Sequence, residues 1–177
     1  SESFDPRGRN IFLLVDVGAG TLDASLFYVA RTEGDKWRFV TYCSAVEYNG
    51  AVNLHRNRLD WLLGAISEGY PCRADLANSI KDAGHNSDCL TIIPASLAEY
   101  VSGMSIKFQN ENDSPDSVFR NSRVGRQIYG VYQGGWQKAG VPKDQLKDLP
   151  TFYCGGGMRV PFYASLPNLF DTKTQGY

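Results

Sequence analysis

The sequence predicts an α/β fold in which a mixed sheet, begun by a three-strand antiparallel meander, has helices packed on it. Three observations predict it. Residues 11–43 hold three strand-like runs divided by turns, apolar residues after position 50 recur at helical spacing, and a strand, a glycine turn and a helix start follow one another near the C-terminus. The 177 residues are enough for one domain with its own core.

The meander is predicted from the N-terminal quarter of the chain. Residues 11–17 form a nearly continuous apolar run, which is typical of a buried strand. Residues 18–21 read Gly-Ala-Gly-Thr and indicate a tight turn. Residues 24–30 and 37–43 are rich in aromatic and β-branched side chains and predict the second and third strands, with a hairpin loop over 32–36.

Helical spacing begins after a turn at Asn49-Gly50. A helix of about four turns, broken at Gly69 and Pro71, is predicted from five apolar residues: Val52, Leu59, Leu62, Leu63 and Ile66. A short helix over 74–83, a short strand over 90–93, a helix over 95–104 and a polar loop over 109–115 are expected to follow.

The longest helical pattern covers residues 116–139 and is expected to end at Gly140, where a helix C-cap belongs. Its inner face is predicted to consist of Phe119, Val124, Ile128, Val131 and Ala139. The three glycines inside it indicate either close backbone packing or a break: Gly130, Gly134 and Gly135. A connector over 141–150, a strand over 151–154 and a helix from about 160 to 170 complete the prediction.

The aromatic and basic side chains of these helices carry further expectations. Tyr129, Tyr132 and Trp136 are expected to fill the core. Arg120, Arg123 and Arg126 are expected to form a solvated helix face, although they could reach a phosphate or a purine. Arg56 and Arg58 are equally open between those two roles.

Composition and charge limit the classes of molecule that the protein is expected to bind and the compartment in which it is expected to work. The net charge of −1 lacks the basic excess that nucleic-acid or anionic-membrane binding needs. No apolar run is long enough to cross a bilayer, and the polar residues 1–10 predict a disordered leader without a signal peptide, so a cytoplasmic protein is expected. The four cysteines are expected to be mostly buried free thiols, with a Cys72–Cys89 disulfide as the alternative. His55 and His85 are too few and too far apart for a zinc site.

Two glycine turns carry the functional signal. The first follows Asp16 and runs through Gly18, Ala19, Gly20 and Thr21 to Asp23; its backbone N–H groups could approach a phosphate closely, and Asp16 could hold a hydrated Mg²⁺. The second consists of Gly155, Gly156 and Gly157, between a strand and a helix start, with Arg159 placed to stack on a purine or contact a phosphate. Neither turn is a Walker A loop or a dinucleotide fingerprint.

The two motifs together resemble a known family. Residues 16–25 resemble the second phosphate motif of actin-like ATPases, typically Asp-x-Gly-Gly-Gly-Thr-x-Asp-x-Ser, and residues 155–161 resemble the adenosine motif of the seventy-kilodalton heat-shock chaperones, typically Gly-Gly-Ser-x-Arg-x-Pro. Their order fits the second half of that ATPase domain. The resemblance covers residues 11–63 and 117–166 and implies a ribonuclease-H/actin-like fold.

The resemblance implies a role for each matching residue. Asp16 would bind Mg²⁺ through water and help to position the attacking water. The turn residues Gly18, Ala19, Gly20 and Thr21 would hold the β and γ phosphates of ATP or ADP, with Asp23 as the second aspartate of the motif. Gly155, Gly156 and Gly157 would face the ribose and adenine, and Arg159 would flank the adenine. The implied function is the ATP-binding lobe of a chaperone-like ATPase, active only with its other lobe and acting on client proteins or with co-chaperones.

The chain also departs from the family. Ala19 replaces the middle glycine of the phosphate motif, and Gly157 replaces the common serine of the adenosine motif. The first lobe is missing, and the insertion over about 67–112 is reduced, so residues 11–170 are expected to form a single lobe followed by a tail over 171–177. Two alternatives stay open: a filament-forming actin-like partition ATPase, and a non-catalytic binding module that keeps the fold.

Overall fold

The computed structural model describes residues 10–34, 36–69, 93, 96–97, 114–147 and 149–169. Several predictions lie outside these residues: the leader up to residue 9, the helix over 74–83, the Cys72–Cys89 bridge, His85 and the tail. Nearly all of the elements expected between residues 90 and 113 lie outside as well.

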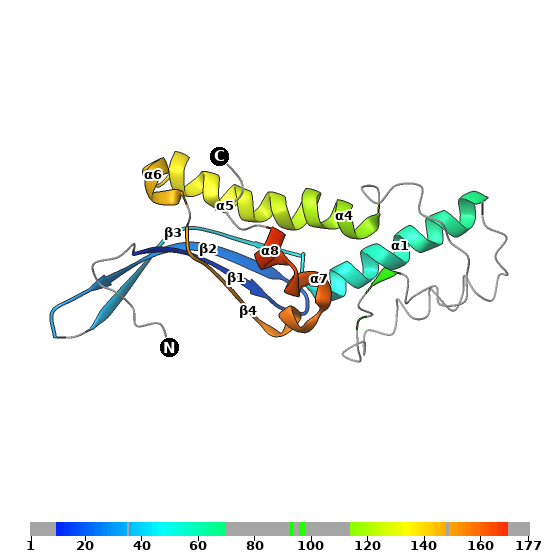
Figure 1. Ribbon diagram of the computed structural model, residues 1–177, viewed down its shortest axis with the longest axis horizontal. Coiled ribbons are helices and arrows are strands. Elements are labelled where there is room, and N and C mark those ends of the chain that lie inside the picture. Colours follow the sequence, from blue (N-terminus) through cyan, green and yellow to red (C-terminus); the bar gives the residue numbers. More distant parts are fainter. Residues whose placement is uncertain are drawn as a thin grey trace.

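A four-stranded mixed sheet forms the centre of the described fold (Figure 1). Its strands are β1 (Ile11–Val17), β2 (Leu22–Arg31), β3 (Trp37–Glu47) and β4 (Thr151–Cys154), in the order β3-β2-β1-β4. β1 pairs antiparallel with β2, β2 pairs antiparallel with β3, and β1 pairs parallel with β4. The predicted α/β fold with its initial meander is therefore confirmed, whereas β3 runs past residue 43, with a register shift opposite Leu26 and Phe27.

One long helix covers one face of the sheet, and a second helix lies beyond its end (Figure 1). The predicted long helix is made of α4 (Pro115–Phe119), the π-helical turn η2 (Arg120–Gly125) and α5 (Arg126–Gln137), and it crosses that face (Figure 1). α1 (Ala51–Gly69) extends away from the end of the sheet. The short helices are α6 (Lys143–Leu146), η3 (Gly156–Arg159), α7 (Pro161–Ala164) and α8 (Leu166–Leu169), so the single helix expected over 160–170 is broken into pieces.

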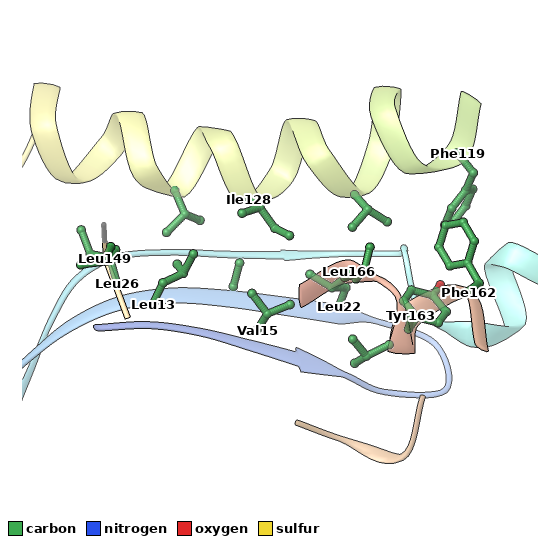
Figure 2. Packing of buried hydrophobic residues seen from close by; sticks show 14 of the residues in the cluster. Leu13, Val15, Leu22, Leu26, Phe119, Ile128, Leu149, Phe162, Tyr163 and Leu166 are labelled. Carbon is green, nitrogen blue, oxygen red and sulfur yellow. The ribbon is translucent and has the colours of Figure 1, made fainter. Parts of the chain in front are cut away.

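The core lies between the sheet and the long helix (Figure 2). Alternation along the strands places one set of side chains on the covered face, because successive strand residues point to opposite sides. Val15 on β1 and Leu22 and Leu26 on β2 are fully buried, and Ile128 faces them from the helix (Figure 2). Val124 and Val131 on the same helix are buried in the same cluster. Phe119, Phe162 and Tyr163 close the core at the end where β1 finishes.

Close packing explains two of the three helix glycines. A Cβ at Gly134 would collide with Cys43 Sγ, and one at Gly135 would collide with Leu26 Cδ2, so α5 lies directly on the sheet there. Gly130 has open space around it among the described atoms, so neither predicted explanation applies to it. Gly140 follows the helix with φ of +70°, as a C-cap glycine does.

Three side-chain predictions for this layer are wrong. Ala139, Tyr129 and Trp136 are exposed rather than buried. Ala139 lies beyond the last residue of α5, and the two aromatic residues lie on the side of α5 that faces away from the sheet. Trp136 instead stacks under the ammonium of Lys143, 3.6 Å from the ring centroid.

The opposite face of the sheet carries an open apolar groove with a volume of about 360 Å³. Its lining is aromatic and aliphatic and comes from all four strands: Phe12, Phe27, Val29, Trp37, Phe39 and Phe152. Phe39 is 68% exposed and Phe152 is 52% exposed. The groove lies toward the start of β1, at the end of the sheet away from the glycine turns.

Candidate functional site

The two glycine turns meet at one end of the sheet. β1 and β4 are parallel neighbours, with Asp16 opposite Cys154, so the turn that follows each strand leaves the same edge. In open α/β sheets, ligands commonly bind outside the carboxyl ends of parallel strands. The structure therefore brings together the two segments that sequence analysis singled out.

The second turn lies directly on the end of β1. Gly155 has φ of +93°, and a Cβ there would collide with Asp16 Oδ1 and Val17 O. A Cβ at Gly157 would collide with Val17 and would lie 3.1 Å from Gly18 O. Both glycines are thus required by the packing of bare backbone against β1 and the first turn.

The first turn is held by the start of α1. The Gly18 carbonyl accepts from Ala51 N (3.2 Å), and the Ala19 carbonyl accepts from Val52 N (2.8 Å). The Gly20 carbonyl accepts from Gly50 N (3.3 Å) and from Asn53 Nδ2 (2.7 Å). Gly50 must be glycine here, because a Cβ would lie 2.6 Å from Gly20 C and Thr21 N.

This arrangement fixes where the N–H groups of the turn point. In a trans peptide the C=O and the following N–H point in opposite directions. Because three successive carbonyls face α1, the N–H groups of Ala19, Gly20 and Thr21 face away from it, and none has an acceptor among the described residues. We call these three donors the amide cradle; outward-facing backbone N–H groups of this kind bind anions.

Two carboxylates lie beside the cradle on the face opposite the long helix. Asp16 and Asp23 are directly opposite each other in the β1–β2 ladder, so their side chains share that face. Asp16 is exposed, whereas Asp23 is half-buried, and its Oδ1 is buried without a hydrogen-bond partner in the described structure. Across the described ranges no group of three or more His, Cys, Asp or Glu side chains is arranged as a metal site would be.

Cys154 lies against Asp16 from the neighbouring strand. The two residues are register partners on adjacent strands, so the thiol and the Asp16 carboxylate lie on the same face of the sheet. Partial burial, then the nearby Asp16 carboxylate, raise the pKa of the Cys154 thiol. Cys43 and Cys154 are both free, but Cys154 is exposed, so the expectation of buried thiols is wrong for it.

Glycines 20 and 156 differ from their neighbours. Among the described atoms, nothing lies within 4 Å of a Cβ placed at either position, and neither has a positive φ in the left-handed range. Both are exposed. The fold therefore does not require these two glycines, and the space beside them is open.

The arginines that the sequence analysis considered lie in different parts of the structure. Arg159 is exposed and ends η3, directly after the second turn. Arg120 and Arg123 lie over the rings of Phe162 and Phe119, at 5.2 and 5.8 Å from the centroids, and Arg126 is exposed.

Arg58 is fully buried, and its Nε and Nη2 each donate at 2.7 Å to the Asp116 carboxylate. Both readings of Arg58 from the sequence, a solvated face and a phosphate contact, are therefore wrong. Arg56 is exposed on the same helix.

A buried polar network behind the turns was missed in the sequence. Gln127 Nε2 donates to the carbonyls of Leu22 (2.6 Å) and Ala45 (3.0 Å), and its Oε1 accepts from Asn49 Nδ2 (2.8 Å). Tyr163 OH donates to the Asn49 carbonyl at 2.6 Å. Gln127 falls at inner-face spacing between Val124 and Val131, and a polar residue at such a position was the available signal.

No protein-family model matches this chain, and a search of curated proteins finds no match either.

Within the described residues, no helix is both long enough and apolar enough to span a lipid bilayer.

Proposed function

We propose that this chain is a nucleotide-binding lobe of the ribonuclease-H/actin type, corresponding to the second half of a chaperone-like ATPase domain. The observation that carries the proposal is the amide cradle, which directs three backbone donors outward beside an exposed carboxylate, at the edge where β1 and β4 both end. The four-stranded order with its antiparallel start supports the same fold type.

In this proposal the cradle of Ala19, Gly20 and Thr21 donates to the β and γ phosphates, as outward N–H groups do in anion sites. Asp16 holds a hydrated Mg²⁺, because its carboxylate is exposed beside the cradle. The bare backbone of residues 155–157 offers a flat surface for the ribose and adenine, with Arg159 at its rim.

The chemistry of the complete enzyme would be attack of water on the γ phosphate, driven by positioning and electrostatics. One lobe supplies one side of such a site, so this chain alone binds nucleotide weakly and hydrolyses it poorly. Gly20 and Gly156 favour a ligand in this space, since the fold itself leaves both positions open.

The proposal is tested by Gly20→Ala. The added methyl meets no described atom, so the free energy of unfolding should change by less than about 0.5 kcal/mol. The methyl is added to the middle residue of the cradle, however, and should weaken the binding of Mg-ATP and Mg-ADP in isothermal titration by crowding the phosphates. Gly130→Ala, at an equally open position on α5, is the matched control and should leave nucleotide binding unchanged. A folded wild-type chain that binds neither nucleotide would overturn the proposal.

A non-catalytic binding module that keeps the fold is the second candidate. The open groove lined by Phe39 and Phe152 favours it, because exposed aromatic surface often marks a protein contact. Gly157 favours it too, since the close packing of that residue leaves no room for the serine side chain of the adenosine motif. Asp16→Asn separates the two: it should reduce Mg-nucleotide affinity in an ATPase lobe and leave a module's affinity for its partner unchanged.

A further inference from the structure

We propose that Asn53 is a positioning residue that keeps the amide cradle open, an inference that rests on the proposed function. Asn53 lies in the first turn of α1, and its Nδ2 donates to the Gly20 carbonyl at 2.7 Å. This is a side-chain bond to the turn, whereas the carbonyls of Gly18 and Ala19 are held by backbone N–H groups of α1.

The Gly20 carbonyl belongs to the peptide whose N–H is that of Thr21. Turning this carbonyl away from α1 would turn the Thr21 N–H inward and remove one donor from the cradle. The only other donor to the Gly20 carbonyl in the described structure is Gly50 N, at the longer distance of 3.3 Å. Asn53 is therefore the stronger of the two restraints on that peptide plane.

The contact between the first turn and α1 also directs the N-terminus of α1, the positive end of the helix dipole, at the turn. The first N–H groups of a helix carry a partial positive charge, and here those of Ala51 and Val52 are occupied by turn carbonyls rather than by a ligand. Hydrogen bonds in a chain polarise one another, so each carbonyl held by α1 makes the N–H on the other side of its peptide a better donor. The N-terminus of α1 thus acts on a bound anion indirectly, through the peptide groups of the turn. Asn53 adds a third hydrogen bond from α1 to a turn carbonyl.

A second asparagine on α1, Asn57, shows that a polar side chain on this helix face does not by itself hold the first turn. Asn57 lies one turn further along α1, and its Nδ2 reaches the Pro115 carbonyl at 3.3 Å, on α4 rather than on the turn. The two asparagines share a helix face and a residue type, and they differ in which segment they hold.

The experiment replaces each asparagine by leucine, which has a similar shape, no donor and a higher helix propensity. Isothermal titration with Mg-ATP and with inorganic pyrophosphate should give about three- to tenfold weaker binding for Asn53→Leu, the loss expected for one hydrogen bond. Asn57→Leu should bind both probes as the wild type does. Hydrogen exchange supplies a readout that needs no ligand: the Val52 amide, which donates to the Ala19 carbonyl, should lose protection in Asn53→Leu and keep it in Asn57→Leu.

The outcomes separate this inference from the proposed function. If the wild type binds neither probe, the proposed function fails, and the inference fails with it. If the wild type binds and Asn53→Leu binds equally well with unchanged Val52 protection, only the role of Asn53 is refuted. Equal losses in Asn53→Leu and Asn57→Leu would also refute it, because they would report a general effect on α1.

Discussion

The two glycine turns reach their shapes by different physical means. The first, residues 18–21, is held by hydrogen bonds from its carbonyls to α1. The second, residues 155–157, is held by backbone that packs on β1 where no side chain fits. The difference teaches that the fold itself accounts for Gly155 and Gly157 and does not account for Gly20 and Gly156, so only the latter two are left for the proposed ligand to explain.

The largest expected effect comes from a substitution that disrupts the second turn. Gly155→Ala forces a side chain onto φ of +93° and into contact with Asp16 and Val17, so the free energy of unfolding should fall by about 4 kcal/mol. Gly156→Ala, one residue away in open space, should stay within about 0.5 kcal/mol of the wild type. Urea denaturation followed by tryptophan fluorescence measures both, and similar losses in the two variants would contradict the distinction.

A smaller effect is expected where the segments that follow the two turns are joined. Tyr163 on α7 donates to the carbonyl of Asn49, the residue before the glycine that contacts the first turn. Tyr163→Phe leaves that buried carbonyl without its partner and should cost about 2 kcal/mol in the same denaturation experiment. Tyr132→Phe removes a half-buried hydroxyl that donates to the Leu146 carbonyl, away from the turns, and should cost less. A larger loss for Tyr132→Phe would refute the link between the segments.

The smallest effect concerns the pKa of Cys154. Thiolate is the reactive form, and burial and the Asp16 carboxylate both disfavour it, so the pH midpoint for alkylation should lie above that of an ordinary thiol. Asp16→Asn removes the charge but not the burial, which is the larger cause, so the midpoint should fall only part of the way. Iodoacetamide labelling across pH, with mass spectrometry of the peptide that contains Cys154, measures it. An unchanged midpoint would mean that the Asp16 carboxylate does not act on the thiol.

Much of the fold could be predicted because its signals are local. Alternation and apolar runs gave three strands of the meander near their observed positions, and residues 151–154 were predicted as a strand with the observed bounds. The π-helical turn at 120–125 and the exposure of Tyr129 and Trp136 were not predicted. Helical spacing alone does not reveal where a helix will touch the sheet, which depends on residues distant in sequence such as Cys43 and Leu26.

The candidate site, like the fold, could be predicted only in part from the sequence. Each glycine turn could be identified in the sequence, but the carbonyl contacts that orient the first turn come from α1, and the packing that requires Gly155 and Gly157 comes from β1. The pairing of Arg58 with Asp116 could not be predicted, because it depends on how α1 meets α4. Whether the site takes a nucleotide stays a prediction.

The parallel pairing of β1 with β4 has a consequence for the order of folding. The first turn and its helix are encoded early in the chain, whereas the strand that completes the edge is encoded near the end of the described residues. Contacts between distant segments carry a large loop-closure entropy and form late. On the ribosome, the meander and α1 can therefore assemble first, and the site is finished only when the last strand has emerged.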